Sequence, residues 1–291
     1  MMRWRRRLLT VPVLALAAIA ELLSPPACAG EKPLIEKGFN LLYQLKFEEA
    51  RRQFMNWQRE NPADALSYEA IAASYLFEEF YEQGVLTSEF FLNDERLLGG
   101  IQGKPDESRR EKFEAANQRG RSIALEQLKT NPRDADALFA LTIAAGMRSD
   151  FASILMRRQM ESLSLIKEAE LYAKRLLKVQ SEAADAWLSL GAANYIIGSL
   201  PAYKRFFLWF GQIRGNKQLG MEQLKITAEK GHYLKPFAQI FLALTALREK
   251  QGDLACNQLL DLVAHFPENH LFQAELARLN CTRADSQHGG Q

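Results

Sequence analysis

GFNLLYQLKFEEARRQFMNWQRENP, residues 38–62, is the stretch that decides the fold. Its only glycine, Gly38, is followed by Ala50, Phe54 and Pro62, at steps of 12, 4 and 8 residues. These steps are typical of a helix–turn–helix repeat with a period of about 34 residues. The Asn–Pro pair at the end of the stretch stops the second helix, because proline cannot continue a helix and restricts the residue before it. The stretch therefore predicts stacked helix pairs.

Similar spacing recurs in two later parts of the chain. Ala255, Leu259 and Pro267 repeat the steps of 4 and 8 residues. A third partial match, in the middle of the chain, consists of Trp187, Leu190, Gly191 and Asn194. No stretch alternates apolar and polar residues between turn signals as a strand does. The sequence therefore predicts an all-α fold.

The predicted architecture is an α-solenoid of about five helix pairs plus a C-terminal capping helix, within residues 30–283. The expected pairs occupy about 33–59, 63–129, 135–183, 184–230 and 236–266, and the capping helix occupies about 270–279. Glycine- and proline-containing insertions at about 84–109 and 198–215 interrupt the second and fourth pairs. We expect the polar, glycine-rich residues 284–291 to be disordered.

Residues 1–29 have the pattern of a signal peptide: four arginines, an apolar run and a small-residue site ending at Ala29. A retained membrane anchor is the first alternative, but the apolar run is short and contains Pro12 and Glu21. Lipid attachment at Cys28 is the second alternative, but two prolines stand where such a site has a leucine and a small residue. We expect cleavage after Ala29 and an exported protein, periplasmic or secreted.

The charge of the chain belongs mostly to this N-terminal segment. Its removal takes away four arginines and one glutamate and changes the formal charge from +2 to −1. Nucleic-acid binding needs clustered lysine and arginine, so we expect no nucleic-acid partner. The sequence also predicts no second segment able to span a membrane.

Cys256 and Cys281 remain after the predicted cleavage. If Cys256 opens one helix and Cys281 follows the next, antiparallel helix, the two lie at the same end of the pair. An exported protein keeps disulfides, so a disulfide is one interpretation. Two buried thiols that act as small apolar side chains are the other. Both alternatives are open at this point.

The spacing described above resembles the tetratricopeptide-repeat family. The resemblance is carried by Gly38, Ala50, Phe54 and Pro62, by Trp187, Leu190 and Gly191, and by Ala255, Leu259 and Pro267. It covers most of residues 31–283, although only the first and last units have regular length. The block 185–267 is also similar to exported bacterial repeat proteins of unassigned role. The resemblance implies binding of peptides or proteins in a concave groove lined by the first helix of each pair, and it implies no catalysis.

The expected groove positions are apolar in this chain. They are Ile35, Phe39 and Leu42 in the first unit, Leu188 and Ala192 in the fourth, and Ile240, Leu244 and Leu247 in the fifth. This departs from family members that hold a peptide's terminal carboxylate with lysine, asparagine and arginine. Either the groove binds an apolar segment, or the insertions fold back and fill it. We favour filling, because a long exposed apolar groove is a liability in a soluble monomer.

An aromatic segment in the second insertion is the first candidate partner-binding site. Its members are Tyr203, Phe206, Phe207, Trp209 and Phe210. Burial between neighbouring helices is the simpler interpretation. The alternative is a wedge that docks on a membrane or an apolar partner, helped by the basic residues 204 and 205.

Phe90 and Phe91 in the first insertion form the second candidate. Aromatic residues in a long loop usually anchor it to the scaffold, but insertions in repeat proteins also gather at binding faces. The sequence leaves both interpretations open.

Signs of catalysis, metal binding or cofactors are missing from the sequence. It has no His-Glu-x-x-His, no Cys-x-x-Cys, no Gly-x-Ser-x-Gly and no phosphate-binding glycine loop. We therefore expect a non-enzymatic scaffold of the cell envelope that binds protein or peptide partners, without a cofactor. One alternative is a membrane-associated adaptor that docks through residues 200–210. The other is an envelope enzyme whose active site leaves no local motif.

Overall fold

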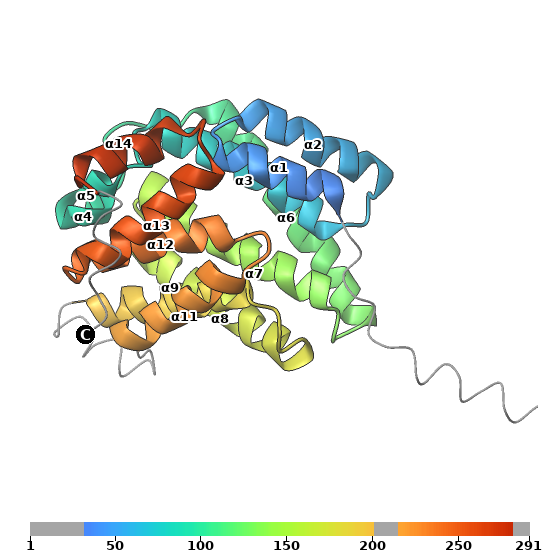
Figure 1. The fold of residues 1–291 in the computed structure, drawn as a ribbon. Helices are drawn as coiled ribbons and strands as arrows, with labels where there is room; N and C mark the ends of the chain where they lie inside the picture. The colour runs from blue at the N-terminus through green and yellow to red at the C-terminus, as the bar shows by residue number, and fades with distance from the viewer. Residues whose placement is uncertain (1–31, 201–214, 282–291) are drawn as a thin grey trace, which may run out of the picture. The chain divides into compact units, whose positions relative to one another are not determined.

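A computed structural model describes residues 32–200 and 215–281 of the protein. All regular secondary structure in these residues is helical, and they contain no strand (Figure 1). The all-α class predicted from the sequence is therefore confirmed.

The first helix pair shows how the deciding stretch folds. Helices α1 (Pro33–Tyr43) and α2 (Phe47–Glu60) are joined by a tight turn in which Leu45 has φ 64°. A side chain at Gly38 would put its Cβ only 2.2 Å from Phe54 Cε1. The glycine therefore lets the two helices approach, and the Phe54 ring fills the space and is fully buried. Burial of such a ring stabilises the fold by about 2–3 kcal/mol.

The later helices follow the predicted pairs closely. Their bounds are α3 (Ala65–Glu82), α4 (Ser88–Leu92), α5 (Asp94–Gly99), α6 (Glu107–Thr130), α7 (Ala135–Asp150), α8 (Gln159–Val179), α9 (Ala186–Ser199), α11 (Lys217–Lys230), α12 (Lys235–Arg248), α13 (Gly252–His265) and α14 (His270–Arg278). Extensive packing joins α3 to α6, α7 to α8, α9 to α11 and α12 to α13. These four packed couples lie at about the residue ranges expected for the second to fifth pairs, and α14 lies where the capping helix was expected.

The third pair is not α-helical throughout. Phe151–Leu155 is a π-helix, η3, that prolongs α7. Helix α8 begins only at Gln159, after Arg157 with φ 57°. The apolar residues of η3 pack against the core and hold this segment on the end of α7.

The first insertion is tied to the scaffold by a buried carboxylate. Glu79 of α3, which is 2 % exposed, accepts hydrogen bonds from Arg109 Nε at 2.6 Å and from the backbone N–H of Asp106 at 3.1 Å. Asp106 in turn caps α6, because its Oδ1 accepts the backbone N–H of Arg109 at 2.8 Å. These bonds fix the point where the insertion returns to the second pair.

The first helices of the pairs face one another through aromatic rings. Phe39 of α1 and Phe139 of α7 both contact Tyr233, with ring centroids 5.3 and 6.1 Å apart. Phe77 of α3 contacts Phe237 of α12, with centroids 5.6 Å apart. We call these five residues the aromatic interior. At these contacts the space along the first helices is occupied by Phe237 of α12 and by Tyr233 of the loop before it.

The loop before α12 is held in the aromatic interior by one carboxylate. Asp185 accepts backbone N–H groups from His232, Tyr233 and Leu234 at 2.9, 3.0 and 3.2 Å. Tyr43 of α1 donates its hydroxyl to the carbonyl of Tyr233 at 3.0 Å. Burial raises the pKa of Tyr43, so the hydroxyl keeps the proton that it donates.

The segment Ala135–Leu155, which joins α7 and η3, is long and apolar enough to cross a membrane. The sequence predicted no second segment of this length and composition, so that prediction is wrong for this helix. Of its apolar window, 67 % is buried against other helices of the protein, as in the core helix of a helical domain. Length and composition alone therefore do not distinguish a membrane span from a core helix here.

Candidate functional site

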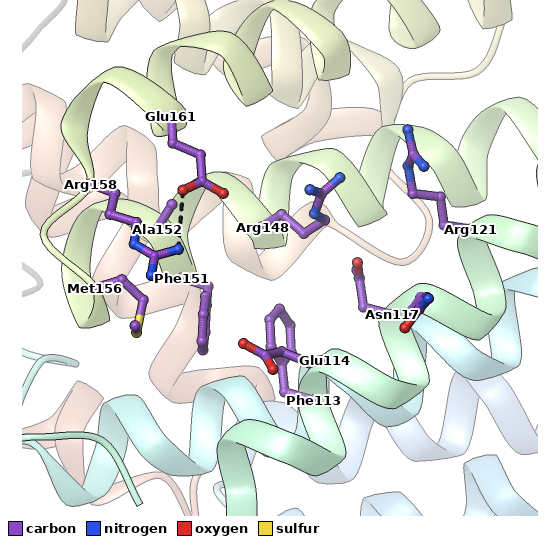
Figure 2. Close-up of a pocket in the computed structure, with 11 residues that line it drawn as sticks. Phe113, Glu114, Asn117, Arg121, Arg148, Phe151, Ala152, Met156, Arg158 and Glu161 are labelled. Carbon is purple, nitrogen blue, oxygen red and sulfur yellow. Dashed lines mark hydrogen bonds and ion pairs between the residues drawn. The ribbon is translucent and has the colours of Figure 1, made fainter. Parts of the chain in front are cut away.

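A pocket of about 430 Å³ lies where α6, the end of α7, η3 and the start of α8 meet (Figure 2). We call it the arginine pocket. Its lining residues are Phe113, Glu114, Asn117, Gln118, Arg121, Arg148, Phe151, Ala152, Met156, Arg158 and Glu161. The volume lies within the range of small-molecule sites, roughly 300–1,000 Å³.

The π-helix η3 shapes one side of the arginine pocket. Its wider turn is closed by the bond from Met156 N to Phe151 O, 3.1 Å long, and the chain then reverses at Arg157. The reversal brings Arg158 to the pocket beside the end of α7. π-helical turns inside α-helices occur frequently at functional sites.

Three guanidinium groups reach the pocket, and they differ in their partners. Arg121 of α6 pairs with Glu168 of α8 at 2.9 Å, and the exposed Arg158 lies 3.5 Å from Glu161. Arg148, on the last turn of α7, is partly buried, and its guanidinium makes no hydrogen bond or ion pair with any residue that the structure describes. Figure 2 shows its side chain between Arg121 on one side and Arg158 with Glu161 on the other.

A buried amide and a buried carboxyl lie behind the arginines. Asn117 is 3 % exposed, and its amide donates to Glu69 Oε2 at 2.8 Å and to the carbonyl of Ala144 at 3.3 Å. Glu69 is fully buried, and its Oε1 has no hydrogen-bond partner. Burial raises the pKa of Glu69 well above its usual value, although Asn117 and two arginines act in the opposite direction. Burial of Glu69 therefore favours its neutral form.

The other wall of the pocket is apolar. The rings of Phe113 and Phe151 stack with centroids 4.8 Å apart and an angle of 24° between their planes. Both side chains are buried, and Ala152 and Met156 lie beside them. The pocket thus combines positively charged donors with an apolar surface.

The structure places Phe90 and Phe91 of the first insertion against the protein itself. Phe90 is 6 % exposed in the core, and Phe91 packs beside it with ring centroids 5.3 Å apart. Arg248 of α12 donates to the carbonyl of Phe91 at 2.8 Å and also pairs with Asp94. In this arrangement the two rings anchor the insertion, as in the simpler interpretation of the sequence.

The capping helix α14 also holds the insertion, through a cluster that we call the clasp. Ser88, at the start of α4, donates its N–H and its hydroxyl to the carboxylate of Glu275, at 3.0 and 2.6 Å. Arg278 binds both Glu275 and the hydroxyl of Ser88. These contacts lower the pKa of Glu275 although its partial burial acts in the opposite direction. The carboxylate is therefore ionised near pH 7 and accepts both bonds.

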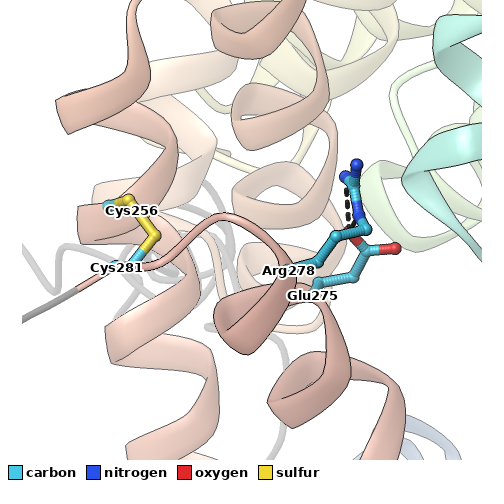
Figure 3. The surroundings of a disulfide bond; sticks show 4 residues. All are labelled: Cys256, Glu275, Arg278 and Cys281. Atoms are coloured by element: carbon cyan, nitrogen blue, oxygen red, sulfur yellow. Dashed lines mark hydrogen bonds and ion pairs between the residues drawn. A yellow bond between two sulfur atoms is a disulfide. The ribbon is translucent and has the colours of Figure 1, made fainter.

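Of the two alternatives for the cysteines, the structure has the disulfide. Cys256 of α13 is bonded to Cys281, which follows α14, with the Cα atoms 5.5 Å apart. Figure 3 shows this bond close to the end of α14, where Glu275 and Arg278 form their ion pair. The disulfide therefore fixes the end of the helix that carries the clasp.

The aromatic candidates of the second insertion lie outside the described residues. They are Tyr203, Phe206, Phe207, Trp209 and Phe210. Their interpretation as a docking wedge stays a prediction.

Sequence reasoning missed the arginine pocket. Asn117 and Arg121 are one helical turn apart, but Arg148 and Arg158 come from later segments, so no local motif joins them. The only sequence signal was the spacing of Asn117 and Arg121 on one face of a long helix. Within the two described ranges, no group of three or more His, Cys, Asp or Glu side chains is placed to hold a metal ion.

No family model matches this chain, and no curated protein is detectably similar to it.

Proposed function

We propose that the protein is a non-enzymatic binding protein of the tetratricopeptide-repeat type, a scaffold that holds a protein partner. Two close contacts support the repeat architecture. In the first pair Gly38 lies against Phe54, and in the fourth pair a Cβ at Gly191 would be 2.9 Å from both the Gly220 carbonyl oxygen and the Leu224 side chain. In both pairs, therefore, a glycine of the first helix lies where that helix crosses the second.

The partner binds at the arginine pocket in this proposal, not along the first helices. The aromatic interior leaves no open groove where Phe39, Phe77 and Phe139 meet α12 and its loop. The arginine pocket is open and is lined by α6, the last turn of α7, η3 and the start of α8. The single observation that carries the proposal is Arg148, a partly buried cation of the pocket with no ion-pair partner among the described residues.

The chemistry of the pocket favours binding over catalysis. Its lining includes no serine, cysteine, histidine or lysine, the common nucleophiles and proton carriers. The exposed carboxylates Glu114 and Glu161 pair with arginines, at 4.0 Å to Arg110 and 3.5 Å to Arg158.

We also propose that the protein works outside the cytoplasm, in the cell envelope. The basic and apolar pattern of residues 1–29 supports export. The bond between Cys256 and Cys281 supports it independently, since disulfides persist in oxidising compartments.

Affinity capture from envelope extract tests the proposal. The protein is compared with Arg148→Gln and with Arg119→Gln, an exposed arginine of α6 that does not line the pocket. We expect a protein partner that is captured by the unchanged protein and by Arg119→Gln but lost from a folded Arg148→Gln. Equal capture by all three would show that the pocket is not the binding site.

A further inference from the structure

The arginine pocket has the chemistry to select a particular kind of ligand, and this inference rests on the proposed function. Its donors come from Arg148 and Arg121. Arg148 has no partner among the described residues, and Arg121 uses one nitrogen, Nη2, in its ion pair with Glu168. A guanidinium has five N–H donors in a planar fork that fits the two oxygens of a carboxylate. The two side chains can therefore bind an anionic group between them.

The groups behind the arginines leave this positive charge uncompensated. Glu69 is a fully buried carboxyl behind Asn117, and burial raises its pKa, which favours the neutral form over a counter-ion for Arg148 or Arg121. Asn117 turns both of its N–H groups away toward Glu69 and Ala144. Its Oδ1 accepts no hydrogen bond from a described residue and is free for a ligand donor.

The rim of the pocket limits the charge of the ligand. Glu114 and Glu161 lie at the pocket on α6 and at the start of α8, and both are exposed. Each of these carboxylates has one arginine beside it, at 4.0 and 3.5 Å, but a dianion such as phosphate would still meet both of them, and like charges at short distance are unfavourable. A monoanion meets less repulsion, so the rim favours a carboxylate over a phosphate.

The stacked rings of Phe113 and Phe151, with Met156 and Ala152, give the ligand an apolar surface to cover. We propose that the arginine pocket binds a carboxylate attached to a compact apolar or aromatic group. The ligand is either a free small molecule or an acidic side chain that stands next to an apolar one in a partner protein. Both present the same chemistry to Arg148 and to the rings.

Calorimetric titration of the purified protein tests the ligand class with 3-phenylpropionate as the probe. Three further compounds each test one feature of this probe. 3-Phenylpropionamide lacks the charge, acetate lacks the apolar group, and inorganic phosphate is the competing anion. We expect 3-phenylpropionate to bind at least about tenfold more tightly than each of the three, because hydrogen bonds to a charged group are worth at least that factor. Equal binding of the amide, or tighter binding of phosphate, would overturn the proposal.

Matched variants test the residues. Arg148→Gln should weaken 3-phenylpropionate binding about tenfold or more, and Arg119→Gln should leave it unchanged. If Arg148→Gln does not fold, judged by its circular dichroism, Arg121→Gln takes its place. Unchanged binding by the folded pocket variant would contradict the inference.

A capped peptide, acetyl-Ala-Phe-Glu-Ala-amide, distinguishes the two sources of the carboxylate. Tighter binding of the peptide than of 3-phenylpropionate assigns the ligand to a partner segment, and weaker binding assigns it to a free small molecule. If neither probe binds while partner capture still depends on Arg148, the ligand class is wrong and the proposed function stands. If capture does not depend on Arg148 either, both fail.

Discussion

The aromatic interior and the arginine pocket both use the second and third helix pairs but differ in how their side chains meet. In the interior, rings from α1, α3 and α7 meet Tyr233 and Phe237, and one carboxylate, Asp185, holds the loop in place. In the pocket, arginines from α6, α7 and the start of α8 surround an open space. The first region is closed by its own side chains, whereas the second is not.

This difference separates the residues that stabilise the fold from the residues that are available to bind a ligand. Buried rings contribute to folding in proportion to the apolar area that they remove from water. A partly buried arginine without a counter-ion contributes little to folding and is available to a ligand. Substitutions in the interior should therefore unfold the protein, and substitutions in the pocket should change binding alone.

The largest expected effect is at the centre of the interior. Phe39 is 6 % exposed and contacts both Phe54 and Tyr233, with ring centroids 5.4 and 5.3 Å apart. Phe39→Ala should lower the free energy of unfolding by about 3–5 kcal/mol. Urea unfolding measures this loss, with Met55→Ala on the exposed side of α2 as the control. A loss no larger than that of the control would mean that the interior is not packed as described.

Removal of the disulfide should have the next largest effect. The bond between Cys256 and Cys281 closes a loop of 25 residues, which corresponds to about 3 kcal/mol. In the double Cys→Ser variant we also expect faster hydrogen exchange at the clasp, at Ser88 and in α14. Unchanged exchange there would show that the disulfide does not hold the clasp.

Glycine-to-alanine substitutions at two helical positions should have smaller effects on stability, and effects of opposite sign. Gly191→Ala should destabilise the protein by about 1–3 kcal/mol, because the new Cβ would lie 2.9 Å from the Gly220 carbonyl oxygen. Gly146→Ala on α7 meets no atom within 4 Å and should stabilise by about 0.5–1 kcal/mol. Thermal unfolding compares the two, and a shift of the same sign in both would contradict the close helix crossing.

The stability of the protein should depend on pH through Asp150, on the last turn of α7. Burial raises the pKa of Asp150 from 3.8 to about 7. As the pH rises from about 4 to 7, the unfolded chain therefore loses this proton before the folded protein does, and stability falls. Asp150→Asn removes that loss, so its advantage over the unchanged protein should grow by about 2–3 kcal/mol between pH 5 and pH 8. A constant difference across this range would mean that the carboxyl is ionised in the folded protein.

The smallest effect on stability is expected in the pocket. Arg148→Gln should change the free energy of unfolding by no more than about 0.5 kcal/mol, because the guanidinium has no partner to lose among the described residues. Urea unfolding beside Arg119→Gln measures this. A loss of several kcal/mol would mean that Arg148 stabilises the fold as the residues of the aromatic interior do, and it would contradict the contrast between the two regions.

Most of the helices could be predicted from the sequence, because their signals are local. The steps from Gly38 to Pro62 predicted the first pair, and the steps from Ala255 to Pro267 predicted α13 in the last pair. The π-helix could not be predicted, because Phe151 continues the apolar pattern of α7 without a break. Its wider turn depends on packing against residues that are distant in the sequence.

The candidate site was harder to predict than the fold. The sequence drew attention to aromatic residues, and those that the structure describes, Phe90 and Phe91, anchor the insertion. Arg148 had no distinguishing neighbour in the sequence, since its role depends on where η3 and α6 lie around it. The partial burial of a cation and its lack of an ion-pair partner can be known only from the folded protein, whereas a cluster of aromatic residues can be seen in the sequence.

Hydrogen exchange with and without saturating 3-phenylpropionate tests the division between the two regions most directly. We predict slower exchange in α6 and in residues 148–161, around the arginine pocket, and unchanged exchange in α1, α3 and α12. Slower exchange in α1, α3 and α12 would contradict the account, because it would place the binding site in the aromatic interior. No change anywhere at saturation would contradict it as well, because the arginine pocket would then hold no ligand of this class.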